Sequence, residues 1–127
     1  MAEIKATCRW NQTPYQVIKG HYYSFHAHGH WRDWTVSCDA RGYASSRLRC
    51  FEKWRRMRQA QWFSLIGAID RDPSTYVDIG GLIAEDKIWQ APCSGTLYGF
   101  ANDAGFMYWN NRGSIDLQLS EVDPDSL

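Results

Sequence analysis

The sequence has no apolar run that approaches the ~20 residues of a membrane-spanning helix, and Met1–Arg9 lacks the apolar centre of a signal peptide. We therefore expect a cytoplasmic protein, or one exported by a route that leaves no recognisable signal. The chain also lacks an excess of charge, because 14 basic and 14 acidic residues give a formal net charge of zero. No global field then favours a nucleic acid or a membrane surface as partner.

Several catalytic and metal-binding signatures are missing too. The four cysteines show no CxxC spacing, which argues against a structural zinc site. Cys38 and Cys50 could form a disulfide in an oxidising compartment, and free buried thiols are an equal alternative. The sequence contains no GxSxG nucleophile elbow and no phosphate-binding glycine loop. We therefore expect a protein that is not an enzyme.

Aromatic residues are abundant by contrast: seven Trp, seven Tyr and five Phe make up 15% of 127 residues. Such side chains favour half-buried strands, and they also offer flat faces to sugar rings or bases. Strand-like runs recur at short intervals between Gly, Pro, Asn and Asp residues. These predicted strands cover residues 15–18, 21–28, 34–38, 62–69, 76–79, 88–89, 96–100 and 114–119.

About eight short strands in a chain of this size predict a single all-β domain, a small β-sandwich of the jelly-roll type. We expect the domain to span residues 1–122 and residues 123–127 to form a loose tail. Residues 51–60 are the exception, because this charged stretch fits either a short helix or a long loop.

A polar loop at 102–113 separates the last two predicted strands. It offers the carboxylate of Asp103 and the amides of Asn102, Asn110 and Asn111 within a bent backbone. Calcium prefers six to eight oxygen ligands of these kinds, and sugar hydroxyls can complete its coordination. A hairpin loop in which Asn and Gly serve only turn geometry is the alternative.

Three segments resemble the calcium-dependent galactophilic (PA-IL-type) bacterial lectins: LIGAI at 65–69, SGTLYGFAND at 94–103 and NNRGSI at 110–115. The six residues between Asp103 and Asn110 match the spacing in that family. Gly20 and Gly29 bracket a strand of matching length in the first half of the chain. The resemblance implies a galactose-binding-like sandwich, Ca²⁺ as cofactor, a galactose-like carbohydrate as ligand, and a homo-oligomer.

The resemblance also implies roles for individual residues. Calcium would be held by side-chain oxygens of Asp103, Asn110 and Asn111, by the backbone carbonyl of Met107, and by a second backbone carbonyl near Asp33. The sugar would contact Asp103, Ala104, Met107 and Asn110.

This sequence departs from the family pattern at two places in the loop. Gly105-Phe106 stands where the family has Pro-Gly, and Arg112 replaces a small serine beside the asparagine pair. A cation next to the loop would repel calcium, so a fold kept with a decayed site is a further alternative. The family's outer sugar contacts, a His and a Gln, have no counterpart in residues 39–61.

Two rival functions come from other parts of the chain. His26, His28 and His30 alternate and could chelate a transition metal in a metal-dependent hydrolase, with Asp33 as a further ligand. The basic segment Arg47–Arg58 interleaves aromatic and cationic side chains, as surfaces that bind anions or nucleic acids do. A polar strand face and a solvated basic loop are the simpler interpretations of these two features.

Overall fold

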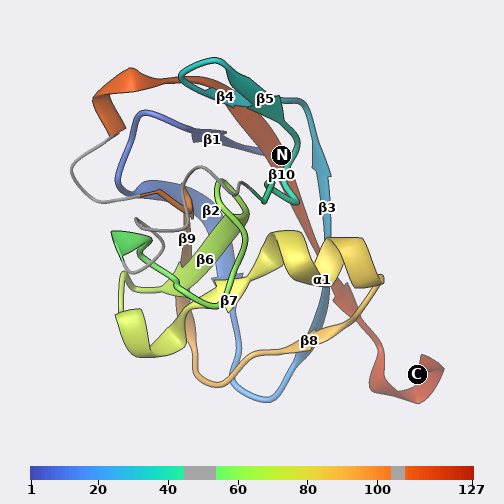
Figure 1. The fold of residues 1–127 in the computed structure, drawn as a ribbon. Coiled ribbons are helices and arrows are strands. Elements are labelled where there is room, and N and C mark those ends of the chain that lie inside the picture. The colour runs from blue at the N-terminus through green and yellow to red at the C-terminus, as the bar shows by residue number, and fades with distance from the viewer. Residues whose placement is uncertain (45–53, 104–107) are drawn as a thin grey trace.

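The computed structural model describes residues 1–44, 54–103 and 108–127. Two antiparallel sheets face each other and form a sandwich (Figure 1). The larger sheet contains β1 (Ala2–Lys5), β3 (Tyr22–His28), β4 (Trp31–Asp33), β5 (Val36–Cys38), β8 (Trp89–Gln90) and β10 (Asn111–Val122). The smaller sheet contains β2 (Asn11–Val17), β6 (Leu65–Ile69), β7 (Val77–Asp78) and β9 (Gly95–Ala101). The predicted all-β sandwich is confirmed.

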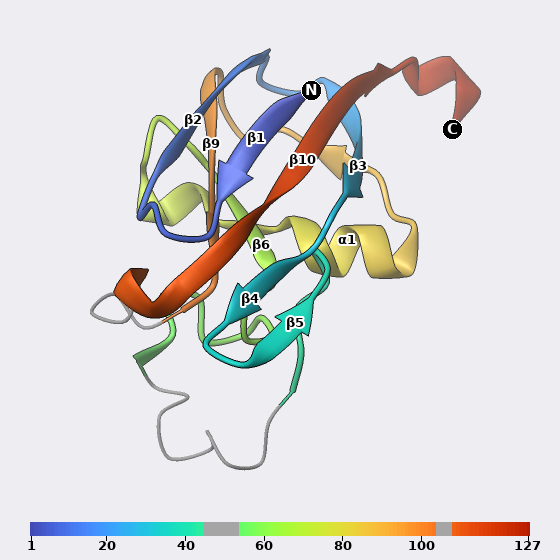
Figure 2. The same cartoon turned by 90° about the horizontal axis from the view of Figure 1, so that it is seen from above.

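Strand β10 organises the larger sheet. The strands of this sheet lie in the order β5-β4-β10-β3-β8, and β1 also pairs with β10. The first residues of β10 pair with β4, and its later residues pair with β3 on one side and with β1 on the other. Figure 2 shows this long diagonal strand with β1, β3 and β4 beside it. The smaller sheet has the order β2-β9-β6-β7.

The core lies between the two sheets. Its residues come from one face of each strand, because side chains alternate between the two faces along a strand. Ile115 and Leu117 in β10 are fully buried, as are Leu65 in β6 and Leu97 in β9. Successive strand residues point to opposite faces, so the buried residues of β10 alternate with exposed ones. The alternation predicted for 21–28 is also present, because Tyr23 and Phe25 are buried and the histidines on the other face are exposed.

Several segments differ from the predictions. The predicted strand at 34–38 begins with two residues of the turn between β4 and β5. The predicted strand at 76–79 is reduced to β7, Val77–Asp78, because the helix α1 spans Ile79–Glu85. The Asp78 side chain caps this helix by accepting a hydrogen bond from the Gly81 backbone N–H at 3.0 Å. Strand β1 was not predicted, because its four residues give too short an alternating pattern.

The remaining elements are single turns of 3-10 helix, at Pro73–Thr75 (η2), Tyr108–Asn110 (η3) and Pro124–Ser126 (η4). Residues 54–60, the described part of the charged stretch, contain no α-helix and follow the loop alternative. Cys38 is a free thiol whose pKa is raised to about 12, chiefly by burial, while Cys50 lies outside the described residues. Within the described ranges, no helix is long and apolar enough to cross a membrane.

The packing of α1 generates a prediction about Gly80. In an exposed helix Gly→Ala stabilises by about 1 kcal/mol. Here a Cβ at Gly80 would overlap the backbone carbonyl of Ala40 and the hydroxyl of Ser64. We therefore expect Gly80→Ala to lower the free energy of unfolding by more than about 1 kcal/mol, measured by urea denaturation. A stability equal to or above that of wild type would contradict this close packing of α1 against Ala40 and Ser64.

Candidate functional site

Asn102 anchors the end of β9 to a distant loop. Its side chain is fully buried, and its Nδ2 donates to the carbonyls of Met57 at 2.8 Å, Gln61 at 2.9 Å and Ala60 at 3.3 Å. Its Oδ1 accepts from the Met57 N–H at 2.9 Å. Residues 57–61 are thereby fixed against β9, and the next residue, Asp103, is held in a defined position.

Two acidic residues, one at the end of β4 and one just after β9, lie near one tyrosine hydroxyl. The Asp33 carboxylate, at the end of β4, accepts a hydrogen bond from the hydroxyl of Tyr43. The pKa of Tyr43 is raised by burial first, then by this hydrogen bond and by the charges of Asp33 and Asp103. Burial also raises the pKa of Asp33, against the opposing effect of the Tyr43 hydrogen bond. Asp103 is only 3% exposed, so this region concentrates buried negative charge.

The chain between β9 and β10 returns to the end of β9. The hydroxyl of Tyr108, in η3, donates to the Ala101 carbonyl at 2.6 Å. The same hydroxyl accepts from the Arg56 guanidinium at 2.8 Å, and the Arg56 N–H donates to the Asp103 carbonyl at 3.2 Å. These contacts fix the Tyr108 side chain, at the start of η3, against the end of β9.

Asn110 and Asn111 have side-chain oxygens that are buried and accept no hydrogen bond in the part of the chain that the structure describes. Asn111 is fully buried, and its Nδ2 donates to the Ala6 carbonyl at 2.8 Å, which fixes the orientation of the amide. A buried acceptor without a donor costs about 1–3 kcal/mol, so two adjacent ones call for an explanation. A cation is the partner that suits amide oxygens beside carboxylates.

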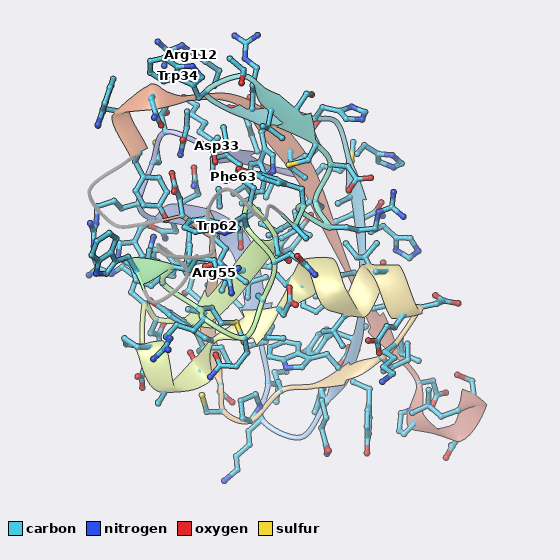
Figure 3. All side chains as sticks on the ribbon, viewed as in Figure 1. Asp33, Trp34, Arg55, Trp62, Phe63 and Arg112 are labelled. Carbon is cyan, nitrogen blue, oxygen red and sulfur yellow. The ribbon has the colours of Figure 1, made fainter. Side chains whose placement is uncertain are left out.

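The strand register brings two of the predicted calcium ligands side by side at one end of the larger sheet. Asn111 is paired with Asp33 across β10 and β4. Figure 3 shows Asp33 lying inward of Trp34 and Arg112, which sit at the outer edge. Ala104 and Met107, which the resemblance implied as backbone contacts, lie outside the described residues.

Arg112 does not share the buried side of its strand with Asn111. Its side chain is exposed, and its guanidinium donates to the carbonyls of Asn111 at 2.6 Å and Trp109 at 3.3 Å. Successive residues of a strand point to opposite faces, so this cation lies on the other side from the Asn111 amide. The repulsion expected from the sequence is therefore weakened by the alternation of β10.

The histidines predicted as a possible metal site do not share one face. Strand β3 ends at His28, and Gly29 with φ +106° turns the chain before His30. His26 and His28 line a cleft between β3 and α1, whereas His30 lines a different groove beside Arg32 and Arg112. Among the described residues, no three His, Cys, Asp or Glu side chains come together as a metal site. The alternation of three histidines on one strand was therefore a wrong prediction.

The basic segment Arg47–Arg58 is described only from Trp54 onward. Arg56 is held in an aromatic cage, with its guanidinium carbon 3.4 Å from the Phe100 ring centroid and 4.5 Å from that of Trp10. Arg55 lies over Trp62 at 5.2 Å, and its Nη2 donates to the Arg58 carbonyl at 2.6 Å. Both cations thus stabilise the loop, and their engagement argues against a free anion-binding surface here.

Sequence reasoning missed the residues that support the site. Tyr43, Arg56 and Tyr108 come from three segments with no common motif, and only the fold brings them together. Asn102 was counted as one more loop amide, although its hydrogen bonds are entirely structural. The signal that was available is the Asn-Asp pair at the end of a predicted strand.

The chain is similar in fold to solved structures of other proteins. No protein-family model matches the chain, and no curated protein matches it in sequence. A solved structure described as "EclA N-terminal domain; PllA-like lectin" matches with a TM-score of 0.67 and 16% identity. The match covers 94% of this chain and 93% of that chain. At this identity the likeness establishes a shared fold, so the chain has the sandwich fold of that lectin domain.

The anchoring role of Asn102 generates a stability prediction. Asn102→Ala removes the hydrogen bonds to residues 57–61 and leaves several buried backbone groups unsatisfied. We expect a loss of about 3 kcal/mol or more in the free energy of unfolding, measured by urea denaturation in the presence of a chelator. The matched control is Asn110→Ala, whose amide oxygen accepts no hydrogen bond from the described residues and which should stay near wild type. Equal losses in the two variants would contradict the anchoring role.

Proposed function

We propose that this chain is a non-catalytic, calcium-dependent lectin that binds a galactose-like carbohydrate through Asp103, Asn110 and Asn111. The observation that carries the proposal is the pair of buried, unsatisfied amide oxygens of Asn110 and Asn111. Asn111 is paired across β10 and β4 with the partly buried Asp33, and Asp103 is a buried carboxylate. The matching fold belongs to a protein described as a lectin, and the PA-IL-type resemblance assigns these same three residues to calcium.

Calcium suits this set of oxygens better than a transition metal does. It is a hard cation that accepts carboxylate, amide and backbone carbonyl oxygens in flexible geometry, and the predicted set of ligands contains no histidine or cysteine. Asp33 and Asp103 supply negative charge in a poorly solvated region, where the attraction for a cation is strong. The backbone carbonyls near Asp33 and at Met107 would complete the set of calcium ligands that the protein supplies.

The sugar would enter the same coordination sphere. Three side chains and two carbonyls leave calcium short of the six to eight ligands it takes, and two neighbouring hydroxyls of a pyranose can fill the remainder. Asp103, Asn110, Ala104 and Met107 would hold those hydroxyls by hydrogen bonds, with the charge-assisted bond to Asp103 the strongest. Assembly into a homo-oligomer would multiply a weak single-site affinity.

The calcium site is tested by calorimetric titration of chelator-treated protein. We expect wild type to bind one Ca²⁺, and Asp103→Asn to lose at least about 1.4 kcal/mol, a tenfold weaker affinity, because one ligand charge is removed. The matched control is Asp116→Asn, which removes the same charge from an exposed position farther along β10.

The asparagine ligands give a second calcium readout. Asn110→Ala should leave the melting temperature of calcium-free protein near wild type but abolish the stabilisation by calcium. That stabilisation is about 2.7 kcal/mol at one hundred times Kd. A heat of calcium binding that persists in both Asp103→Asn and Asn110→Ala would place the ion elsewhere.

Carbohydrate binding should depend on the ion. On a glycan array with calcium present, we expect the protein to bind galactose-terminated glycans. This binding should be lost with excess chelator and should return with Ca²⁺ but not with Mg²⁺. Magnesium requires a smaller and more regular octahedral shell, which a sugar-completed site does not offer. Calcium binding without any glycan signal would contradict the lectin function while leaving the ion site standing.

A further inference from the structure

Two exposed tryptophans adjoin residues of the candidate calcium site in the sequence. Trp34 is 63% exposed and follows Asp33, while Trp109 is 68% exposed and precedes Asn110. Their ring centroids are 6.4 Å apart and their planes are perpendicular. The two indoles come from different elements, the β4–β5 turn and η3, so the fold itself brings them together beside the site.

The backbone of Trp34 adds an independent observation. Asp33 pairs with Val36, so Trp34 and Thr35 form a two-residue hairpin turn. Trp34 has φ +55°, at a position where such turns normally carry glycine because a side chain is strained there. No packing explains the tryptophan, since its ring is largely in solvent. Strain of this kind, beside a candidate binding site, points to function rather than to folding.

The exposure of these rings contrasts with the other tryptophans near the site. Trp31 and Trp62 are 1% and 3% exposed and belong to the packed interior. The Trp109 carbonyl is held by the Arg112 guanidinium at 3.3 Å, so η3 is fixed at the outer edge of β10. Figure 3 places Trp34 and Arg112 together at this edge, outward of Asp33. The indole pair is therefore a preformed apolar surface just outside the ion site.

We propose that Trp34 and Trp109 form a stacking subsite for the apolar C–H face of a second sugar ring, linked to the sugar that calcium holds. The ligand is then an oligosaccharide rather than a monosaccharide. This inference rests on the lectin function proposed above. Aromatic faces contribute large contact area at little entropic cost, and an exposed apolar patch continuous with a polar site marks a ligand surface.

The test variant is Trp34→Gly, because glycine relieves the strained turn while it removes the ring. Calorimetry in calcium would compare lactose with methyl β-galactoside, and melibiose with methyl α-galactoside. In wild type we expect at least one disaccharide to bind ten times more tightly than its matched methyl galactoside. Trp34→Gly should remove that advantage, keep the affinities for calcium and for the methyl galactosides, and leave the melting temperature unchanged or higher.

Further variants separate stacking from general damage. Trp109→Ala should also remove the disaccharide advantage, whereas Trp109→Phe should retain part of it. Ile18→Ala, which removes an exposed apolar side chain outside the site, should behave as wild type. Tryptophan emission should shift to shorter wavelength with the bound disaccharide in wild type and less so in Trp34→Gly.

Several outcomes would overturn the subsite. A disaccharide advantage that survives Trp34→Gly, or a lowered melting temperature in that variant, would assign Trp34 a structural role. Methyl galactosides that bind in calcium with no disaccharide advantage would remove the subsite and keep the lectin function. Calcium binding with no saccharide binding would remove both. Dimerisation lost in Trp34→Gly, measured by sedimentation, would assign the surface to a second copy of this chain.

Discussion

The hydrogen bonds of the Asn102 side chain are the constraint on which the end of the sandwich depends. One buried amide ties the end of β9 to residues 57–61, and all of its donors and its acceptor are used. Backbone bonds extend the same junction, because Phe63 donates to the Asn102 carbonyl at 2.8 Å and Asn102 donates to that of Ser64 at 3.0 Å. The orientation of Asp103 follows from this junction, since the residue before it cannot rotate.

Amides in this region divide into two kinds by their hydrogen bonding. Asn102 is satisfied on both of its polar atoms and so acts as structure. Asn111 is satisfied only on its nitrogen, which donates to Ala6, so its oxygen is held in place and still available. The first arrangement stabilises the protein, whereas the second costs it free energy that a cation in the proposed site would offset. Hydrogen bonding therefore distinguishes the proposed ligand Asn111 from the structural Asn102, although the two residues are of the same type.

The sequence alone predicted the parts of this protein that depend on local pattern. Alternation in 22–28 and 115–119 gave strands with the correct buried faces. The oxygen ligands in the loop after β9, together with the family resemblance, gave the candidate site, which stays a prediction. It did not predict α1, where the capping role of Asp78 overrides a strand-like run, nor the end of β3 before His30. Residues such as Tyr43 and Arg56 act through contacts far apart in sequence, so no pattern along the chain could reveal them.

The turn that carries Trp34 shows how folding and binding compete at this edge. Nothing in the run Asp33-Trp34-Thr35-Val36 resembles a hairpin turn, since the glycine or asparagine that a positive φ favours is absent. The pairing of β4 with β5 and with β10 is strong enough to impose the turn on an unsuitable residue. The same edge also holds the partly buried carboxylate of Asp33, whose pKa is raised by desolvation. Strain and buried charge therefore coincide at one end of a well-packed sandwich, where a bound cation would offset the charge and a ligand would cover the rings.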